Sequence, residues 1–393
     1  MKTEFSKCFH ILSLFFFCYF YIVPAFFVWV YGDMYYVGKE ITYNRDIPHV
    51  FYGAVCFLAG FLSVTMISPI FKMPARAKSK SHLGVSVLFY FILILFFLYQ
   101  VYLILDEKRA ENLYAIRKGE VAGSHLDFLV SLVIGALQYS LLIILVEKRQ
   151  TGLALILILS IILTGLMGSI GRTNLLFSIA IFMILIFKSK ASNVAVLSLL
   201  AMGFMVPIIL SLKTIIYYIG TGEGVSVGNI IDGAVFDFDA YFSSFGHVVA
   251  SYAHAPSLVE SIGYRYFFDF VQGPLFYMKL LGLDLGNSIT YFNTYNILGV
   301  ESSIVPPGYL ALGYLQLDLL GVFIVGMFWS LLGKLSEFVY LKSGCYSEVN
   351  KFVLCFLAAN TFYHGDVRIM IMTYFLPVVS LLISTTVFFE RDR

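Results

Sequence analysis

Charged side chains are scarce in this chain of 393 residues. Asp, Glu, Lys and Arg together make up 13% of it, whereas hydrophobic residues make up 60%. A soluble globular domain carries roughly 25% charged residues, so this chain has too few to cover a water-facing body. The composition therefore indicates a polytopic integral membrane protein. The net charge of +2 is spread over loops, so it does not indicate a surface for nucleic acid.

Cysteine is also rare, and its spacing matches no metal site. The five cysteines are Cys8, Cys18, Cys56, Cys345 and Cys355. Three of them lie inside apolar runs, so we expect no disulfide framework and no cysteine-bound metal. The acidic pair in "DFD" (237–239) is too short a pattern to indicate a metal site. We expect no metal and no other cofactor.

Long apolar runs predict an all-α membrane domain with about ten transmembrane helices, within a range of about ten to twelve. The runs lie near 9–31, 50–71, 83–105, 126–146, 152–168, 173–187, 192–212, 306–332, 350–365 and 367–388. Some of these runs are short, so one or two are candidates for re-entrant segments. The first run has no small-residue cleavage site, so we expect a retained helix rather than a signal peptide.

Basic residues gather in alternate loops, as in the segments 72–80, 148–149 and 188–190. Because such loops usually face the cytoplasm, we expect both termini to be cytoplasmic. The opposite face then carries the turn around Arg172, the segment 213–305 and the turn "YHGDVR" (363–368). We therefore expect one membrane domain, 1–393, with 213–305 as a large external loop.

The external segment mixes acidic and aromatic residues, as in "FDFDAYFSSFGHVVASYAHAP" (236–256). This mixture is typical of short helices lying at the membrane surface. Aromatic faces also bind sugar rings, while carboxylates accept hydrogen bonds from sugar hydroxyls. An interfacial cap and a saccharide cleft therefore both fit the composition of this segment.

One carboxylate, Asp318 in "GYLQLDLLGV", falls in the middle of a predicted span. Ionisable residues inside a membrane often mark ion or proton pathways. A carboxylate can instead accept a hydrogen bond between two helices. We favour the second interpretation, because the apolar runs contain almost no other charge.

Three arginines are predicted on the external face: Arg172, Arg265 and Arg368. Guanidinium is always charged and forms paired hydrogen bonds that suit phosphate. The first N–H groups of a helix also favour anions, and Arg172 and Arg368 are predicted to lie at helix starts. We expect the three arginines to bind a diphosphate. The alternative is that each arginine only reaches to the membrane interface.

Candidate general bases lie on the same face. His364 stands four residues before Arg368, and histidine is the usual general base. Glu301 is our second candidate, and Asp237 and Asp239 are rivals. A histidine at a helix end is more often structural, so both roles stay open for His364.

Three short motifs carry a resemblance to a known family. They are "GSIGRTNLL" (168–176), "ESSIVPPGYLALGYLQLDLLGVFIVGMF" (301–328) and "FYHGDVRIMI" (362–371). With the large loop in the second half of the chain, they resemble the O-antigen polymerases, the Wzy-type family of bacterial polysaccharide polymerases. Thr173 departs from the small residue that many members carry after the arginine.

The resemblance implies a fold like that of the GT-C glycosyltransferases and the O-antigen ligases. It also implies an enzyme of lipopolysaccharide biosynthesis at the periplasmic face of the bacterial inner membrane. Such an enzyme joins undecaprenyl-diphosphate-linked oligosaccharide repeat units by glycosyl transfer from the lipid diphosphate to a sugar hydroxyl. It works within membrane lipid and without a cofactor or nucleic acid. Whether a chain-length regulator binds as a further partner stays open.

On this resemblance, Arg172, Arg265 and Arg368 would hold the leaving diphosphate, and His364 or Glu301 would take the hydroxyl proton. An O-antigen ligase would use similar chemistry. A lipid-linked oligosaccharide flippase or other transporter would need a cationic path through the helices. A membrane O-acyltransferase would pair a buried histidine with a polar partner within the helices.

Overall fold

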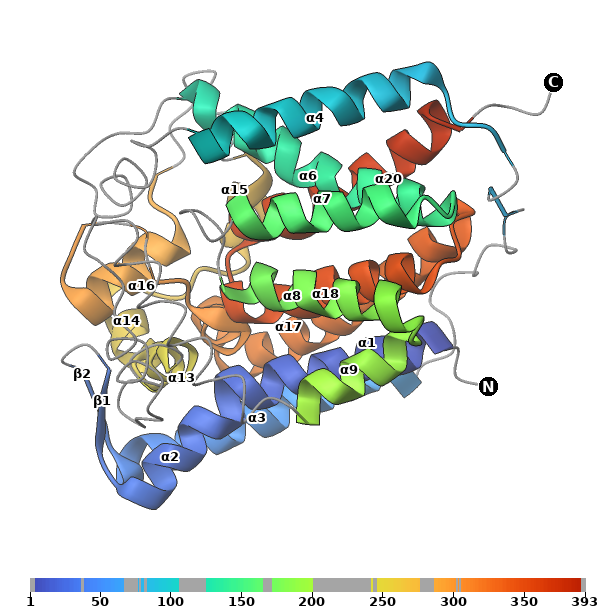
Figure 1. Cartoon of the computed structure of the whole chain (residues 1–393). Coiled ribbons are helices and arrows are strands. Elements are labelled where there is room, and N and C mark those ends of the chain that lie inside the picture. The colour runs from blue at the N-terminus through green and yellow to red at the C-terminus, as the bar shows by residue number, and fades with distance from the viewer. Residues whose placement is uncertain are drawn as a thin grey trace, which may run out of the picture.

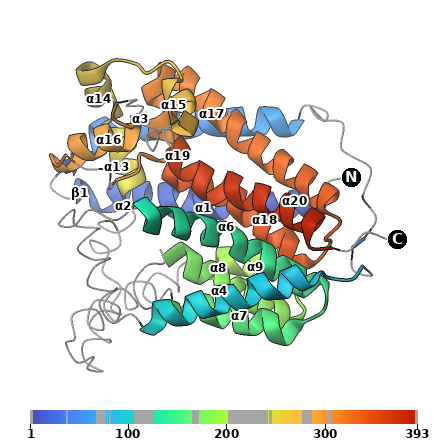
Figure 2. The ribbon, with the colours of Figure 1, turned by 90° about the horizontal axis from the view of Figure 1, so that it is seen from above.

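The structure is a computed structural model of the whole chain. It describes residues 4–36, 39–66, 77, 79–80, 83–105, 125–164, 172–200, 242, 246–275, 286–301, 303 and 305–389. The described part is mostly helical, and most of its long helices run along one common direction (Figure 1). Figure 2 shows the same helices from above, with the short helices gathered at one end of the body.

Fourteen helical segments of the described chain build the long body. They are α1 (Glu4–Phe17), η1 (Cys18–Ile22), α2 (Val23–Tyr31), α3 (Tyr43–Met66), α4 (Val87–Leu105), α6 (His125–Glu147), α7 (Thr151–Thr164), α8 (Arg172–Phe187), α9 (Ala191–Leu200), α17 (Gly308–Ser343), α18 (Glu348–His364), α19 (Val367–Met370), η4 (Ile371–Phe375) and α20 (Leu376–Val387). A second group lies at one end of the body. It comprises the hairpin β1 (Met34–Tyr36) and β2 (Lys39–Ile41), and the helices α13 (His247–Ala253), α14 (Ala255–Ile262), α15 (Phe268–Leu275) and α16 (Ile289–Leu298). We call this second group the cap.

Four described helices are long and apolar enough to cross a membrane. They are Glu4–Tyr31, Tyr43–Thr65, Gly308–Ser343 and Val367–Val387. Shorter apolar helices accompany them at Val87–Tyr102, Val133–Glu147, Thr151–Ile162 and Phe177–Phe187. The expectation of a helical membrane protein agrees with these findings. The larger count of about ten spans stays a prediction.

The first and last long helices each contain a π-helical turn, and a proline follows each turn closely. Pro24 stands two residues after η1, and Pro377 stands two residues after η4. Proline donates no backbone hydrogen bond and crowds the carbonyl four residues earlier. A wider π turn just before the proline accommodates both effects.

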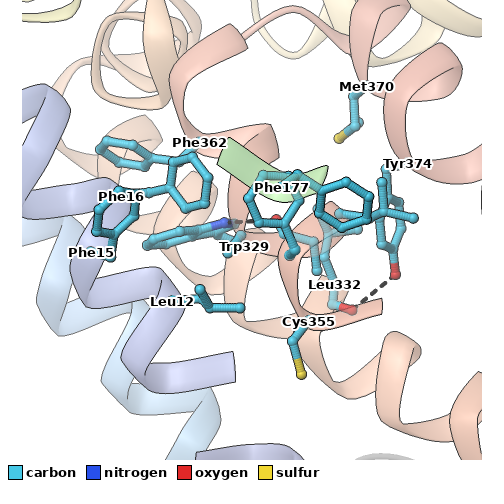
Figure 3. Packing of buried hydrophobic residues seen from close by; sticks show 14 of the residues in the cluster. Leu12, Phe15, Phe16, Phe177, Trp329, Leu332, Cys355, Phe362, Met370 and Tyr374 are labelled. Atoms are coloured by element: carbon cyan, nitrogen blue, oxygen red, sulfur yellow. Dashed lines mark hydrogen bonds between the residues drawn. The ribbon is translucent and has the colours of Figure 1, made fainter. Parts of the chain in front are cut away.

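The centre of the body is packed with aromatic rings around Trp329 of α17 (Figure 3). Trp329 lies 4.9 Å from Phe362, between ring centroids, and its Nε1 donates to the carbonyl of Ala358 at 3.1 Å. The Tyr374 hydroxyl donates to the carbonyl of Leu332 at 2.9 Å. Both polar groups on these rings therefore have partners, as buried Trp and Tyr require.

Helices α3 and α17 approach so closely that only glycine fits at two positions. A Cβ at Gly60 would lie 2.0 Å from the carbonyl oxygen of Phe323. A Cβ at Gly326 would lie 2.2 Å from the carbonyl oxygen of Phe57. Small residues at a helix interface allow this backbone contact, which is typical of membrane helices.

The helix predicted over 306–332 is not one continuous span. The backbone leaves the helical region at Leu317 (φ −162°, ψ 45°) and Asp318 (φ 54°, ψ −147°). A Cβ on Gly321 would lie 2.0 Å from the carbonyl oxygen of Gly313, although eight helical residues would separate the two by about 12 Å. The first nine residues of α17 therefore fold back on the rest.

This turn corrects our interpretation of Asp318. The residue is exposed and lies at the turn, not in the middle of a span. Its Oδ1 accepts from the neighbouring N–H of Leu319 at 2.7 Å, and Oδ2 accepts a long hydrogen bond of 3.5 Å from the hydroxyl of Tyr264. Asp318 therefore contacts the loop after α14 and does not join two spanning helices.

Candidate functional site

The start of α8 lies at the same end of the body as the cap. Phe177 in α8 packs against Phe356 in α18, with ring centroids 4.6 Å apart. Beyond the other end of α8, the N–H of Ala191 donates to the Glu348 carboxylate at the start of α18, at 2.8 Å. The two helices are therefore antiparallel, and α8 begins where α18 ends.

Helix α8 begins at Arg172, as predicted, although the side chain of this arginine lies outside the described part. Helix α18 ends at His364, and α19 follows immediately beside the cap (Figure 2). The described parts of the three segments expected on one face thus lie at one end of the body. We call it the cap end.

Arg368 forms an ion pair with Asp366, two residues earlier. The closest contact, from Nη2 to Oδ2, is 2.7 Å, and Nε lies 3.2 Å from Oδ1. The two side chains are 14% and 2% exposed, respectively. Asp366 also accepts from the backbone N–H of Arg368 and from the hydroxyl of Thr290 in α16. This carboxylate therefore orients the guanidinium and joins α16 to the start of α19.

The ionised form of Asp366 is favoured despite its burial. Burial acts to raise the pKa of this carboxyl, but the hydrogen bonds and the charge of Arg368 outweigh it and lower the pKa. The hydrogen bond from Thr290 acts in the same direction. The pair therefore stays ionised at neutral pH.

His364 lies among aromatic rings and next to a second histidine. Its ring centroid is 4.1 Å from that of Tyr363, which packs in turn against His247 of α13 at 5.4 Å. Burial, together with the nearby His247, lowers the pKa of His364 to about 3, although Asp366 opposes the shift. His364 is therefore a neutral imidazole at physiological pH. Only the neutral form can accept a proton.

Arg265 holds the cap against the turn in α17. Its backbone N–H donates to the carbonyl of Leu315 at 2.9 Å, and its Nε lies 2.7 Å from Asp269 Oδ2. Asp269 Oδ2 also accepts from the amide of Gln316 at 2.8 Å. The side chains of Arg265 and Asp269 are 13% and 4% exposed. The N–H groups of Arg265 and Tyr266 thus satisfy the carbonyls of Leu315 and Gln316, where the first part of α17 ends.

Helix α16 contacts both arginine–aspartate pairs. The Arg265 guanidinium lies over the ring of Phe292, 5.2 Å from its centroid, and Thr290 donates to the partner of Arg368. The guanidinium Nη2 also donates to Gln272, whose amide bonds the backbone just before α16. The two pairs are therefore held by one short helix, and each pair is neutral overall.

The other predicted site residues are less constrained. Glu301 is exposed, two residues after the left-handed Gly299 that ends α16. Asp237 and Asp239 lie outside the described residues. Within the described part of the chain, no group of three His, Cys, Asp or Glu side chains is arranged to hold a metal ion. All five cysteines are free.

The partners of the arginines were not predicted from the sequence. Asp366 lies in the turn "YHGDVR", two residues before Arg368, where it could have been noticed. Asp269 stands four residues after Arg265, a spacing that brings side chains together on a helix. His247 and Thr290 are distant in sequence, and only the folded chain brings them beside residues 364–366.

Comparisons of this chain with protein-family models, with curated proteins and with solved structures find no match.

Proposed function

We propose that the chain is a membrane glycosyltransferase of the O-antigen polymerase type. It would polymerise undecaprenyl-diphosphate-linked oligosaccharide repeat units into polysaccharide. The observation that carries the proposal is the cap end itself. There His364 and two buried arginine–aspartate pairs lie at the end of the body where α8 begins.

In the proposed reaction, a hydroxyl oxygen of the acceptor sugar attacks the anomeric carbon of the donor. The bond from that carbon to the phosphate oxygen breaks, and the lipid diphosphate leaves with the bonding electrons. Arg368 would contact this leaving group, because its guanidinium is already oriented by Asp366. Each arginine–aspartate pair is neutral overall, so binding a diphosphate requires further positive charge. We assign that charge to Arg172, and Arg265 would be an additional contact of the diphosphate.

The hydroxyl proton needs an acceptor, and His364 is our first candidate. Its low pKa keeps the imidazole unprotonated, so the ring is always ready to accept. The same low pKa makes it a weak base, so it would pass the proton on quickly. Glu301 is the second candidate, and its exposure favours exchange of the proton with water.

The proposal includes a place in the cell and a topology. We propose the bacterial inner membrane, about ten crossings in a GT-C-like plan, cytoplasmic termini and a periplasmic cap. The two ends of the described chain lie at the end of the body opposite the cap, which supports this arrangement (Figure 1). Lysines such as Lys80 and Lys148 lie at that end as well. The partners would be membrane lipid and the lipid-linked oligosaccharide.

The test uses the purified protein in lipid nanodiscs with a lipid-linked repeat unit prepared from the producing cell. We expect a ladder of polymers, and we expect Arg172→Ala and Arg368→Lys to shorten or abolish it at matched amounts of folded protein. Arg45→Ala serves as the control, because Arg45 is 67% exposed in its pair with Asp46. No ladder from the wild-type protein, or an unchanged ladder from Arg172→Ala, would contradict the proposal.

Deletion of the gene separates the neighbouring functions. Loss of a polymerase leaves lipopolysaccharide capped with a single repeat unit, whereas loss of a ligase leaves uncapped core. Loss of a flippase would leave repeat units on the cytoplasmic leaflet.

Cysteine labelling tests the geometry, because positions 172 and 368 must be accessible from the same side of the membrane.

A further inference from the structure

A second group of polar side chains lies at the cap end, where α3, α13 and α17 meet. It comprises His49, Tyr252, Tyr264, Tyr314 and Asp318, and we call it the junction cluster. His49 stacks on Tyr252, with centroids 4.6 Å apart and planes 5° from parallel. The edge of Tyr314 meets both rings, at 5.1 Å from His49 and 5.7 Å from Tyr252. The proposed reaction uses none of these residues.

Asp318 gives the junction cluster its charge. The carboxylate is exposed, and its negative charge acts on His49, Tyr252, Tyr264 and Tyr314. Among the described residues, only one of its oxygens is held closely, by the backbone N–H of Leu319 at 2.7 Å. The other accepts the long bond of 3.5 Å from Tyr264. Such a carboxylate has lone pairs available for a ligand.

The backbone around the junction cluster is strained. Within the described chain, five residues other than glycine have positive φ, and three of them meet here: Tyr266 (45°), Phe267 (63°) and Asp318 (54°). The combination of φ 54° and ψ −147° at Asp318 is close to a region that glycine occupies almost exclusively. A turn alone would favour glycine at this position. An aspartate held there against strain indicates a use for its side chain.

The polar groups of the junction cluster suit a neutral ligand rather than an anion. Its formal charge comes from Asp318, and Glu260 adds a second negative charge near Tyr314. The Nε2 atom of His49 is buried and makes no hydrogen bond within the described residues. Phosphate would be repelled, whereas hydroxyl groups would donate to the carboxylate.

We propose that the junction cluster binds the sugar of the acceptor repeat unit, a neutral saccharide. This inference rests on the proposed function, because it assigns the acceptor to one side of the cap and the diphosphate to the other. The ring of Tyr314 would pack against the apolar face of the sugar, and Asp318 would accept from its hydroxyls. Arg265 follows Tyr264 directly in the chain, and its backbone bonds Leu315, so the two regions adjoin.

A binding experiment tests the inference without requiring turnover. The probe is the free oligosaccharide released by mild acid from the lipid-linked repeat of the producing cell. Its affinity for the full-length protein in nanodiscs is measured by saturation-transfer NMR. We expect Asp318→Gly and Asp318→Asn to weaken binding about tenfold, the effect of losing one hydrogen bond to a charged group.

The glycine variant keeps the experiment interpretable, because glycine accepts the backbone conformation of Asp318 without strain. We expect its melting temperature to equal or exceed that of the wild type. The matched control is Glu40→Gln, which alters an exposed carboxylate in the cap that also accepts from a tyrosine hydroxyl, Tyr35, at 2.9 Å. Saccharide affinity should be unchanged in this control.

The outcomes separate the inference from the proposed function. Equal affinity in the wild type and both Asp318 variants overturns the inference, as does the absence of binding by the wild type. A polymer ladder whose KM for the acceptor is unchanged in Asp318→Gly also overturns it, while the proposed function stands. Binding that depends on Asp318 supports the inference even if no ladder forms, in which case only the proposed function fails.

Discussion

The two ends of the helical body use charged side chains differently. At the end opposite the cap, lysines and Glu348 contact backbone groups at helix ends, and Glu348 also pairs with Lys351 at 2.6 Å. Lys334 donates to the carbonyl of Val64 near the end of α3, at 2.6 Å, and Lys80 donates to the carbonyl of Thr385 near the end of α20. Glu348 accepts from the first N–H of α9. Each charge therefore matches the dipole of the helix end that it contacts.

At the cap end, arginines pair with aspartates, and two of these pairs are buried on both sides. Arg265 with Asp269 and Arg368 with Asp366 are both buried, whereas Asp318 is exposed in strained backbone. Lysines could bond the free carbonyls at helix ends, as they do at the other end, at a lower cost in desolvation free energy. Buried pairs cost desolvation free energy, so they are retained more readily where a defined orientation of the guanidinium serves a function. The comparison therefore supports the proposal that the diphosphate is bound at the cap end.

The largest expected effect comes from breaking a cap-end pair. Asp366→Ala leaves Arg368 buried without its carboxylate and removes the acceptor of Thr290. We expect it to lower the free energy of unfolding by about 3–5 kcal/mol and to abolish polymer formation. Thermal unfolding in detergent measures the first effect, and the nanodisc assay measures the second.

The control for this prediction is Arg45, whose side chain is 67% exposed although its partner Asp46 is only 5% exposed. Arg45→Ala should change the free energy of unfolding by about 0–1 kcal/mol, because solvent screens the exposed guanidinium and Asp46 keeps the hydrogen bonds from Thr42. Similar losses in Asp366→Ala and Arg45→Ala would remove the distinction between an arginine that is buried with its partner and one that is exposed to solvent.

A second prediction concerns the loss of stability at acidic pH. His364 has a lowered pKa in the folded chain, about 3 against an ordinary value near 6.5. Its contribution to stability is therefore complete above about pH 6.5 and is lost as the pH falls toward the folded pKa. Between pH 6.5 and 5 we expect the wild type to lose on the order of 1–2 kcal/mol more than His364→Gln.

The measurement is the melting temperature of both proteins at several pH values in that range. Asp366 does not confuse the result, because its pKa is lowered and its contribution is lost only below the ordinary carboxyl range, ~3.9. Parallel curves for the two proteins would mean that His364 is not held in its neutral form.

The smallest expected effect lies at the opposite end. Lys334→Met removes the hydrogen bond to Val64 but keeps much of the apolar stem. We expect a loss of about 1–2 kcal/mol in the free energy of unfolding, as for a hydrogen bond from a charged group. The polymer ladder should be unchanged at matched amounts of folded protein. A shortened ladder would show that chemistry is not confined to the cap end.

Apolar periodicity and run length were enough to predict much of the helical body. The runs expected at 152–168 and 173–187 correspond to Thr151–Thr164 and Arg172–Phe187. The described part of the expected external loop, from residue 242 onward, forms short helices, as its mixed composition indicated. These features depend on local composition, which a single sequence displays directly.

Features that depend on distant contacts were not predictable in the same way. The apolar run around Asp318 looks continuous in sequence, yet the chain turns there because Gly313 packs on Gly321 and the 265–266 backbone bonds residues 315–316. The small hairpin of β1 and β2 was also not expected. Likewise, Thr290 reaches Asp366 across 76 residues of sequence.

The π-helical turns in the first and last long helices have a consequence for insertions and deletions. Each π turn holds one residue more than an α turn, and one residue corresponds to about 100° of rotation around the helix axis. Losing one residue from Ile371–Phe375 would restore regular winding and swing the whole of Leu376–Val387 around its axis, while Asp366 stayed in place. The deletion of one residue would thus change which side chains of the helix face lipid, while the helix itself stayed folded.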